Sequence, residues 1–190
     1  MSLAETVPHL FTVADMRAMV RAGVIEEGAR VELIEGELIE MPADGPLHNE
    51  WSSALGFWLY RALDPESCKI IPGSTLVLSE RNAPKPDYYV VPIDFDFEVG
   101  GGQDVLLALE ESDTTLRRDL GWKADLYARS GIRDYWAIDL KAKRLHVLRR
   151  AKAGRYTDVQ DHDAEQSVEA LLIPGLVLRL ADLPQVGRGL

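Results

Sequence analysis

Residues 106–131 read LLALEESDTTLRRDLGWKADLYARSG and place a buried-strand pattern just before a helix pattern. Residues 105–109 are all apolar and show no alternation with polar residues, which predicts a strand covered on both faces and central in its sheet. In residues 120–130, apolar side chains recur at helical spacing and share one broad arc of a short helix. Lys123 falls inside this apolar arc. The stretch therefore predicts a central strand, a helix after it, and one lysine that faces the interior.

The rest of the chain supplies further helix and strand patterns but neither a repeat nor a long linker. We therefore expect one domain over residues 1–190. The order of elements predicts an α/β (α+β) fold with a mixed central β-sheet flanked by helices. Helices are expected near residues 12–23 and 48–63, and strands within residues 30–41, 70–80, 86–92, 134–140, 144–150, 156–159 and 169–180.

Composition and cysteine usage narrow the class of protein. Apolar residues make up 46% of the chain and charged residues 27%, values that are ordinary for a soluble globular protein. The N-terminal stretch lacks the features of a signal peptide, and the chain has no apolar run of about 18 residues. Cys68 is the single cysteine, so it has no intrachain disulfide partner. These features predict a cytoplasmic protein without a membrane segment.

The net charge of −10 argues against loose binding to nucleic acid, because contacts with phosphates need basic groups. Residues 141–155, KAKRLHVLRRAKAGR, nevertheless contain seven lysines or arginines and no acid, which leaves fourteen basic against thirty-one acidic residues elsewhere. This basic strip fits either a solvated hairpin or a phosphate-facing patch in which Arg149 and Arg150 contact DNA.

Three polar residues stand where packing alone would favour apolar ones. Asp87 opens a strand, Glu110 closes the most hydrophobic strand, and Lys123 lies on the following helix. A buried ammonium needs a paired charge, and neighbouring carboxylates need a cation. Because carboxylate and carbonyl oxygens suit Mg²⁺ or Mn²⁺, these residue types indicate metal-assisted hydrolysis of a phosphoester.

Three stretches together resemble the Uma-type endonuclease family of prokaryotes, which belongs to the PD-(D/E)XK nuclease superfamily. These stretches are RVELIEGELIEMP followed by His48, then KPDYYVV, then LLALEESDTTLRRDLGWKADLYARSGIRDYWAIDL. The resemblance runs from FTVADM to about LVLRL. It implies a restriction-endonuclease-like core with a four-stranded mixed sheet, Mg²⁺-dependent cleavage of DNA, and a homodimer.

Carried over position by position, the resemblance gives Asp87 and Glu110 the role of metal ligands. The carbonyl of Glu111 could add a third ligand, and Lys123 would assist the nucleophilic water. The sequence departs from the commonest family pattern at Glu111 and at Ser112, because the family often has a small or apolar residue and then Ser-Pro in this region. Strand alternation should turn the side chain of Glu111 away from the metal.

Two further residues match the N-terminal part of the family pattern. Glu32 could face the metal pocket or lie on a solvated strand face. His48 could exchange a proton near the phosphate or belong to a helix start.

Three functions remain compatible with the sequence. The leading hypothesis is a divalent-metal-dependent endonuclease that hydrolyses DNA phosphodiester bonds. The alternatives are a non-cleaving nucleic-acid-binding or protein-interaction module that keeps the nuclease fold, and a hydrolase acting on a smaller phosphoester such as a nucleotide.

Overall fold

The computed structural model describes residues 7–184, which pack as two compact units. Within these residues, the smaller unit comprises 7–43 and Thr75–Pro84, and the larger unit comprises Asp44–Ser74 and 85–184. The prediction of one domain over residues 1–190 reaches beyond the described residues and stays a prediction.

The smaller unit combines one helix with a β-hairpin. Helix α1 (Val13–Arg21) begins at a capping box, in which Thr12 and Asp15 bond to each other's backbone N–H groups. Strands β1 (Val31–Ile34) and β2 (Glu37–Glu40) pair antiparallel around a two-residue turn at Glu35-Gly36. Both turn residues have positive φ, as a type I′ turn requires. The predicted helix and hairpin are thus confirmed.

The larger unit is built on a six-stranded mixed sheet in the order β3-β4-β5-β6-β7-β8. All neighbours pair antiparallel except β5 and β6, which are parallel. The strands are β3 (Cys68–Pro72), β4 (Tyr88–Pro92), β5 (Leu107–Ser112), β6 (Asp134–Asp139), β7 (Arg144–Lys152) and β8 (Arg155–His162). All six residues of β5 are buried, and the strand has neighbours on both sides, as the unbroken apolar run predicted.

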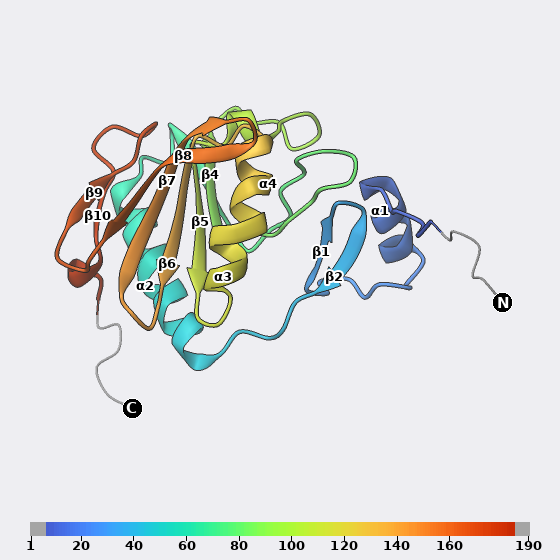
Figure 1. Cartoon of the computed structure of the whole chain (residues 1–190), viewed down its shortest axis with the longest axis horizontal. Coiled ribbons are helices and arrows are strands. Elements are labelled where there is room, and N and C mark those ends of the chain that lie inside the picture. Colours follow the sequence, from blue (N-terminus) through green and yellow to red (C-terminus); the bar gives the residue numbers. More distant parts are fainter. Residues whose placement is uncertain (1–6, 185–190) are drawn as a thin grey trace. The chain divides into compact units, whose positions relative to one another are not determined.

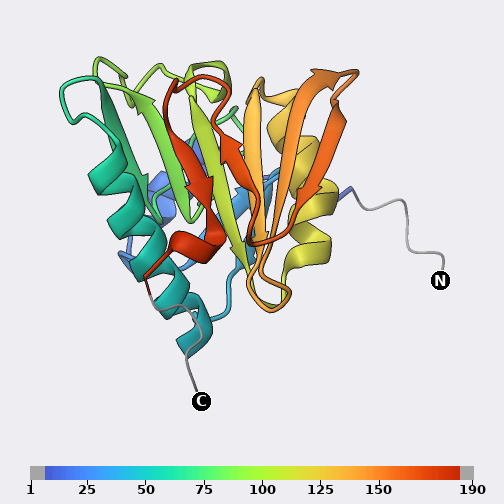
Figure 2. The same cartoon turned by 90° about the vertical axis from the view of Figure 1, so that its left-hand side faces the viewer.

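Helices and a small hairpin cover the two faces of this sheet (Figures 1 and 2). Helix α2 (Pro46–Ala62) and the hairpin of β9 (Ser167–Glu169) and β10 (Val177–Arg179) lie on one face. Helix α4 (Ala124–Arg129) lies on the other. Short 3₁₀ turns, η1 (Gly102–Asp104) and η3 (Leu180–Asp182), complete the unit. The expected mixed sheet with flanking helices is confirmed, with six strands where the resemblance implied four.

The sequence-based strand over residues 70–80 is wrong as a single element. Strand β3 ends at Pro72, and Gly73 follows with positive φ, which lets the chain turn at no steric cost. Residues Thr75–Pro84 belong to the smaller unit, where Leu33 and Ala83 exchange backbone hydrogen bonds. The first part of residues 70–80 therefore packs in the larger unit and the second part in the smaller unit.

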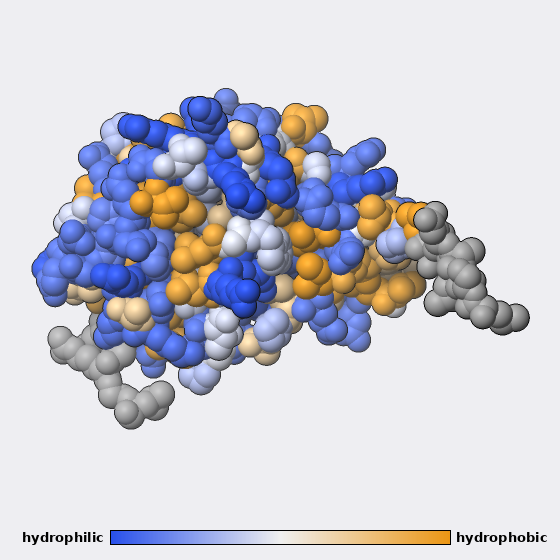
Figure 3. Space-filling model, viewed as in Figure 1, coloured by the Kyte–Doolittle hydropathy of each residue, from blue (hydrophilic) through white to orange (hydrophobic). Residues whose placement is uncertain are grey.

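Hydrophilic residues cover much of the face drawn in Figure 3, and hydrophobic residues form separate patches between them. In the described residues 7–184, no helix combines the length and the hydropathy that crossing a bilayer requires. The large apolar side chains that stay exposed include Val24, Phe57, Tyr60 and Val99.

Candidate active site

The candidate site lies where β5 runs past the end of β4. The pairing of these strands ends at Tyr88 opposite Leu109, so the last residues of β5 have no β4 partner beside them. Glu110 lies in this overhang and is 2% exposed. Lys123 is 1% exposed, and its Nζ lies 2.7 Å from Oε1 of Glu110. The lysine that the sequence placed on an apolar helix face is thus buried against the carboxylate at the end of the central strand.

A break in the helix brings Lys123 to this position. The helical stretch starts at α3 (Leu116–Arg118), passes through the π-helical turn η2 (Asp119–Lys123), and continues as α4. Gly121 interrupts it with φ −100° and ψ −117°, outside the helical region. The hydroxyl of Tyr135 donates to the carbonyl of Asp119 (3.0 Å), which satisfies a backbone acceptor at the break. The predicted helix over residues 120–130 therefore starts earlier and is kinked.

Asp119 ties this helical stretch to the end of β5. Its buried carboxylate accepts hydrogen bonds from the hydroxyls of Ser112 (2.8 Å) and Thr115 and from Nε of Arg118 (3.1 Å). Ser112 lies two residues after Glu110, so the strand carrying the acid and the helix carrying the lysine are joined by side chains. Asp119 was not identified from the sequence. In the sequence, the only feature that could have pointed to Asp119 is that it is a polar residue between Arg118 and Leu120.

Asp87 stands directly before β4 and contacts the end of β5 that has no β4 partner. Its Oδ2 accepts a 2.6 Å hydrogen bond from the backbone N–H of Glu111, and its Oδ1 lies 3.2 Å from Nε2 of His48. Burial opposes ionisation, but the hydrogen bond and charge of His48, the Glu111 N–H and the charge of Lys123 lower the pKa of Asp87 below its ordinary value. Asp87 is therefore ionised at neutral pH, and with 21% of its side chain exposed it is more open to solvent than Glu110.

Strand alternation turns the side chain of Glu111 to the opposite face of β5 from that of Glu110, and its direction relative to the metal stays a prediction. It is buried beside His48, with Oε2 3.8 Å from Nε2. Burial, followed by the charges of Asp87 and Glu110, raises the pKa of Glu111 to about 10. Burial therefore favours the protonated form of this side chain.

His48 lies in the first turn of α2 and faces the acids rather than only starting the helix. Besides Asp87 it approaches Asp44, whose Oδ1 lies 3.8 Å from Nδ1. The histidine that the sequence left between two interpretations is thus placed next to the acid that opens β4.

The acids of the site outnumber the nearby positive charges. Burial raises the pKa of Glu110 well above its ordinary value; Lys123 opposes this shift, while the carboxylates of Asp87 and Asp119 add to it. A second cation near Glu110 and Asp87 would relieve this repulsion.

The donor set fits a hard divalent cation. In residues 7–184, no three His, Cys, Asp or Glu side chains form a ready-made metal cage. Mg²⁺ does not need one, because it commonly binds one or two carboxylates and keeps water and substrate phosphate oxygens as its other ligands. Asp87 and Glu110 supply two carboxylates, and a carboxylate that accepts hydrogen bonds still has free lone pairs. The N–H of Glu111 faces Asp87, and the carbonyl of the same residue lies on the same side of an extended strand.

Comparison with known proteins shows the family of the chain and a solved structure with a related fold. Residues 14–181 match the family Uma2, whose description is "Putative restriction endonuclease". The chain belongs to the Uma2 family. A crystal structure of "a putative nuclease belonging to DUF820" from Anabaena variabilis shares the fold with a TM-score of 0.59 and 15% identity, over 80% of this chain and 88% of that one. No curated protein matches the chain.

Membership of the Uma2 family confirms the resemblance seen in the sequence and supports a nuclease function. The structure brings together Asp87, Glu110, Lys123 and His48, with the backbone of Glu111 between them. Their roles in catalysis and metal binding stay predictions.

Glu32 belongs to the smaller unit of this Uma2 chain. It lies on β1 and is buried, so it does not form a solvated strand face. Its part in the site stays a prediction.

Acids from other elements compensate the basic strip of residues 141–155. Arg149, named in the sequence as a DNA contact, instead forms a two-point ion pair with the fully buried Asp134 (2.7 and 3.2 Å) and donates to the carbonyl of Glu169. Arg150 is exposed, with Nε 3.6 Å from Asp158. The geometry therefore favours a structural role for Arg149 and leaves Arg150 available at the surface.

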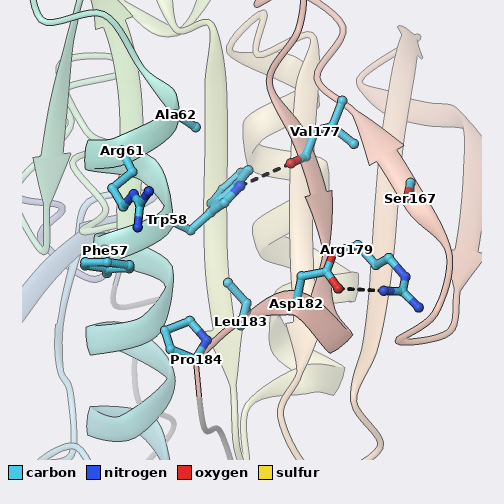
Figure 4. A pocket seen from close by; sticks show the side chains of 10 residues that line it. All are labelled: Phe57, Trp58, Arg61, Ala62, Ser167, Val177, Arg179, Asp182, Leu183 and Pro184. Carbon is cyan, nitrogen blue, oxygen red and sulfur yellow. Dashed lines mark hydrogen bonds and ion pairs between the residues drawn. The ribbon is translucent and has the colours of Figure 1, made fainter.

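A separate groove of about 490 Å³ lies between α2 and β10 (Figure 4). Trp58 spans it and donates from Nε1 to the carbonyl of Val177 (3.1 Å). His48 lies ten residues before Trp58 on the same helix, about 15 Å along its axis. None of the residues proposed for the active site lines the groove, whose walls are Phe57, Trp58, Arg61, Ala62, Ser167, Val177, Arg179, Asp182, Leu183 and Pro184.

Proposed function

We propose that this Uma2 family member is a divalent-metal-dependent endonuclease that hydrolyses DNA phosphodiester bonds. The observation that carries the proposal is the buried Lys123–Glu110 pair at the end of the central strand, with Asp87 beside it. A buried ammonium next to acids is costly for a purely structural site, because each charge must be removed from water. At a site that binds phosphate, the same ammonium can stabilise negative charge on the phosphate.

Asp87, Glu110 and the carbonyl of Glu111 would hold Mg²⁺ or Mn²⁺. When bound, the ion supplies a Lewis acid for the phosphate and lowers the pKa of a water molecule. Lys123 donates hydrogen bonds that orient the water or stabilise negative charge on the phosphate. Asp87 is the ionised acid that is open to solvent, so it offers the entry point for the cation.

His48 and Glu32 are additional candidates of lower rank. His48 touches Asp87 and can take or give a proton there, depending on its own protonation. Glu32 is a buried acid of the smaller unit. Arg150 remains a candidate phosphate contact because its side chain is exposed.

The proposal includes DNA as the substrate, which the family supports. It includes a homodimer, supported by the abundance of Trp and Tyr, which are enriched at interfaces. It also includes a cytoplasmic location, supported by the single cysteine.

The test incubates the full chain with supercoiled plasmid, short duplex DNA and single-stranded DNA in the presence of Mg²⁺, Mn²⁺ or EDTA. Cutting of supercoiled circles by the wild type, with loss in EDTA, is the expected result for an endonuclease. Asp87→Asn, Glu110→Gln and Lys123→Met should each abolish it, while the matched surface change Thr114→Ala should not.

Three outcomes would count against the proposal. DNA binding without cleavage by the folded wild type would favour the non-cleaving module. Turnover of nucleotides but not of polynucleotides would favour a hydrolase of small phosphoesters. Cleavage that survives all three substitutions would remove these residues from the mechanism.

A further inference from the structure

Tyr127 contacts the same carboxylate oxygen as Lys123. It lies four residues later in the chain, so the two side chains share one helix face. Its hydroxyl donates a 2.6 Å hydrogen bond to Oε1 of Glu110, and Nζ of Lys123 lies 2.7 Å from this oxygen. Two donors therefore meet on one oxygen of Glu110.

We propose that Tyr127 is a positioning residue that fixes the carboxylate of Glu110 and keeps its second oxygen, Oε2, directed at the metal. This inference rests on the proposed function, because it assigns the cation to Glu110. A carboxylate held on one oxygen by two donors from one helix face cannot rotate about its last bond without breaking both contacts. With only one donor the carboxylate of Glu110 rotates more easily, and its Oε2 no longer has a fixed direction.

The packing around Tyr127 fixes the direction of its hydroxyl. The ring is 0% exposed and meets the ring of Tyr135 edge to face, with centroids 4.9 Å apart. Tyr135 in turn stacks on Tyr156, with centroids 6.1 Å apart. The hydroxyl of Tyr156 donates to the carbonyl of Ile132, which anchors the end of the row. The row of three rings holds the ring of Tyr127 in place, with its hydroxyl on Glu110.

The chain offers a matched control for this residue. Tyr135 is also 0% exposed and belongs to the same ring pair, but its hydroxyl donates to the backbone carbonyl of Asp119 instead of a carboxylate. Tyr127→Phe and Tyr135→Phe each keep the ring and remove one buried hydroxyl. They differ in whether the lost hydrogen bond touches Glu110.

The experiment measures Mn²⁺ binding to the full chain by calorimetry or electron paramagnetic resonance, with the melting temperature of each variant recorded first. Tyr127→Phe should weaken Mn²⁺ binding about 10- to 100-fold, the usual cost of losing a partner that orients a metal ligand. Tyr135→Phe should leave the Mn²⁺ dissociation constant within about 2-fold of the wild-type value, despite a comparable loss of melting temperature. Equal Mn²⁺ affinity in Tyr127→Phe and wild type overturns the inference, as does equal weakening by both variants.

Cleavage assays on the same samples separate this inference from the proposed function. If the wild type binds Mn²⁺ without cutting DNA and Tyr127→Phe binds it more weakly, the nuclease proposal fails and the role of Tyr127 stands. If Tyr127→Phe cleaves DNA with an unchanged Mn²⁺ requirement, the nuclease proposal stands and the role of Tyr127 fails. Where both hold, Tyr127→Phe should need more Mn²⁺ for half-maximal cleavage and recover most of its rate at saturation.

Discussion

Nζ of Lys123 lies 2.7 Å from Oε1 of Glu110, and both side chains are almost fully removed from solvent. The pair joins the central strand to the helix that follows it. In such a buried position each side chain stabilises the charged form of the other, since an isolated buried charge is unstable.

Removing one partner of this pair should cost more stability than removing both. Lys123→Met leaves Glu110 without its nearest cation and should lower the free energy of unfolding by roughly 3–5 kcal/mol. Adding Glu110→Gln should restore a large part of the loss without restoring cleavage, because it removes the unpaired charge. Urea unfolding of both single variants and of the double variant checks this. Additive losses would show that the two residues are not coupled.

Glu111 should make the metal-free protein less stable as the pH rises. The folded pKa of about 10 is above the ordinary 4.5, so the unfolded chain releases this proton first and stability falls between these values. Glu111→Gln removes this loss. In EDTA, the melting temperature of Glu111→Gln minus that of the wild type should therefore grow between about pH 5 and about pH 9. A difference that stays constant with pH contradicts the raised pKa.

The bond between Ser112 and Asp119 should contribute measurably to stability. Ser112→Ala removes one donor from a buried carboxylate and should cost about 1–3 kcal/mol in urea unfolding. Thr114→Ala, two residues away, is the control, because Thr114 is exposed. Equal stability of the two variants would argue against Asp119 as the residue that ties the helix to β5.

Substitution of Arg149 should lower the stability of the protein, whereas substitution of Arg150 should not. Arg149→Met leaves Asp134 buried without its cation and should cost roughly 3–5 kcal/mol in the free energy of unfolding. Arg150→Ala should leave stability unchanged. If DNA binds at this surface, Arg150→Ala should reduce the salt dependence of binding. A stable Arg149→Met variant that has lost DNA affinity would return Arg149 to the list of DNA contacts.

Divalent cations should raise the melting temperature of the wild type. An ion that binds the folded state but not the unfolded chain stabilises by mass action, so the rise should increase with Mn²⁺ concentration and disappear in EDTA. Asp87→Asn should abolish it, because a neutral amide is a weaker ligand for a hard cation. A rise of equal size in Asp87→Asn would place the cation elsewhere.

Local periodicity predicted most elements of the larger unit. The apolar run ending at Glu110 became a strand buried on both faces, and Lys123 proved to be on the buried side of its helix. The break at Gly121 was not predicted, because apolar spacing records which face is buried and not whether the backbone stays regular. The two halves of residues 70–80 also could not be told apart, since both are apolar and they differ only in the core that they join.

The sequence by itself determined which segments are buried, which three charged residues interrupt them, and the family to which the chain belongs. Only the tertiary structure decided which charges meet. It placed Arg149 on Asp134, the hydroxyls of Ser112 and Thr115 on Asp119, and Tyr127 on Glu110. The physical reason is that spacing along the chain sets the face on which a side chain lies, whereas its partner is set by packing between elements far apart in sequence.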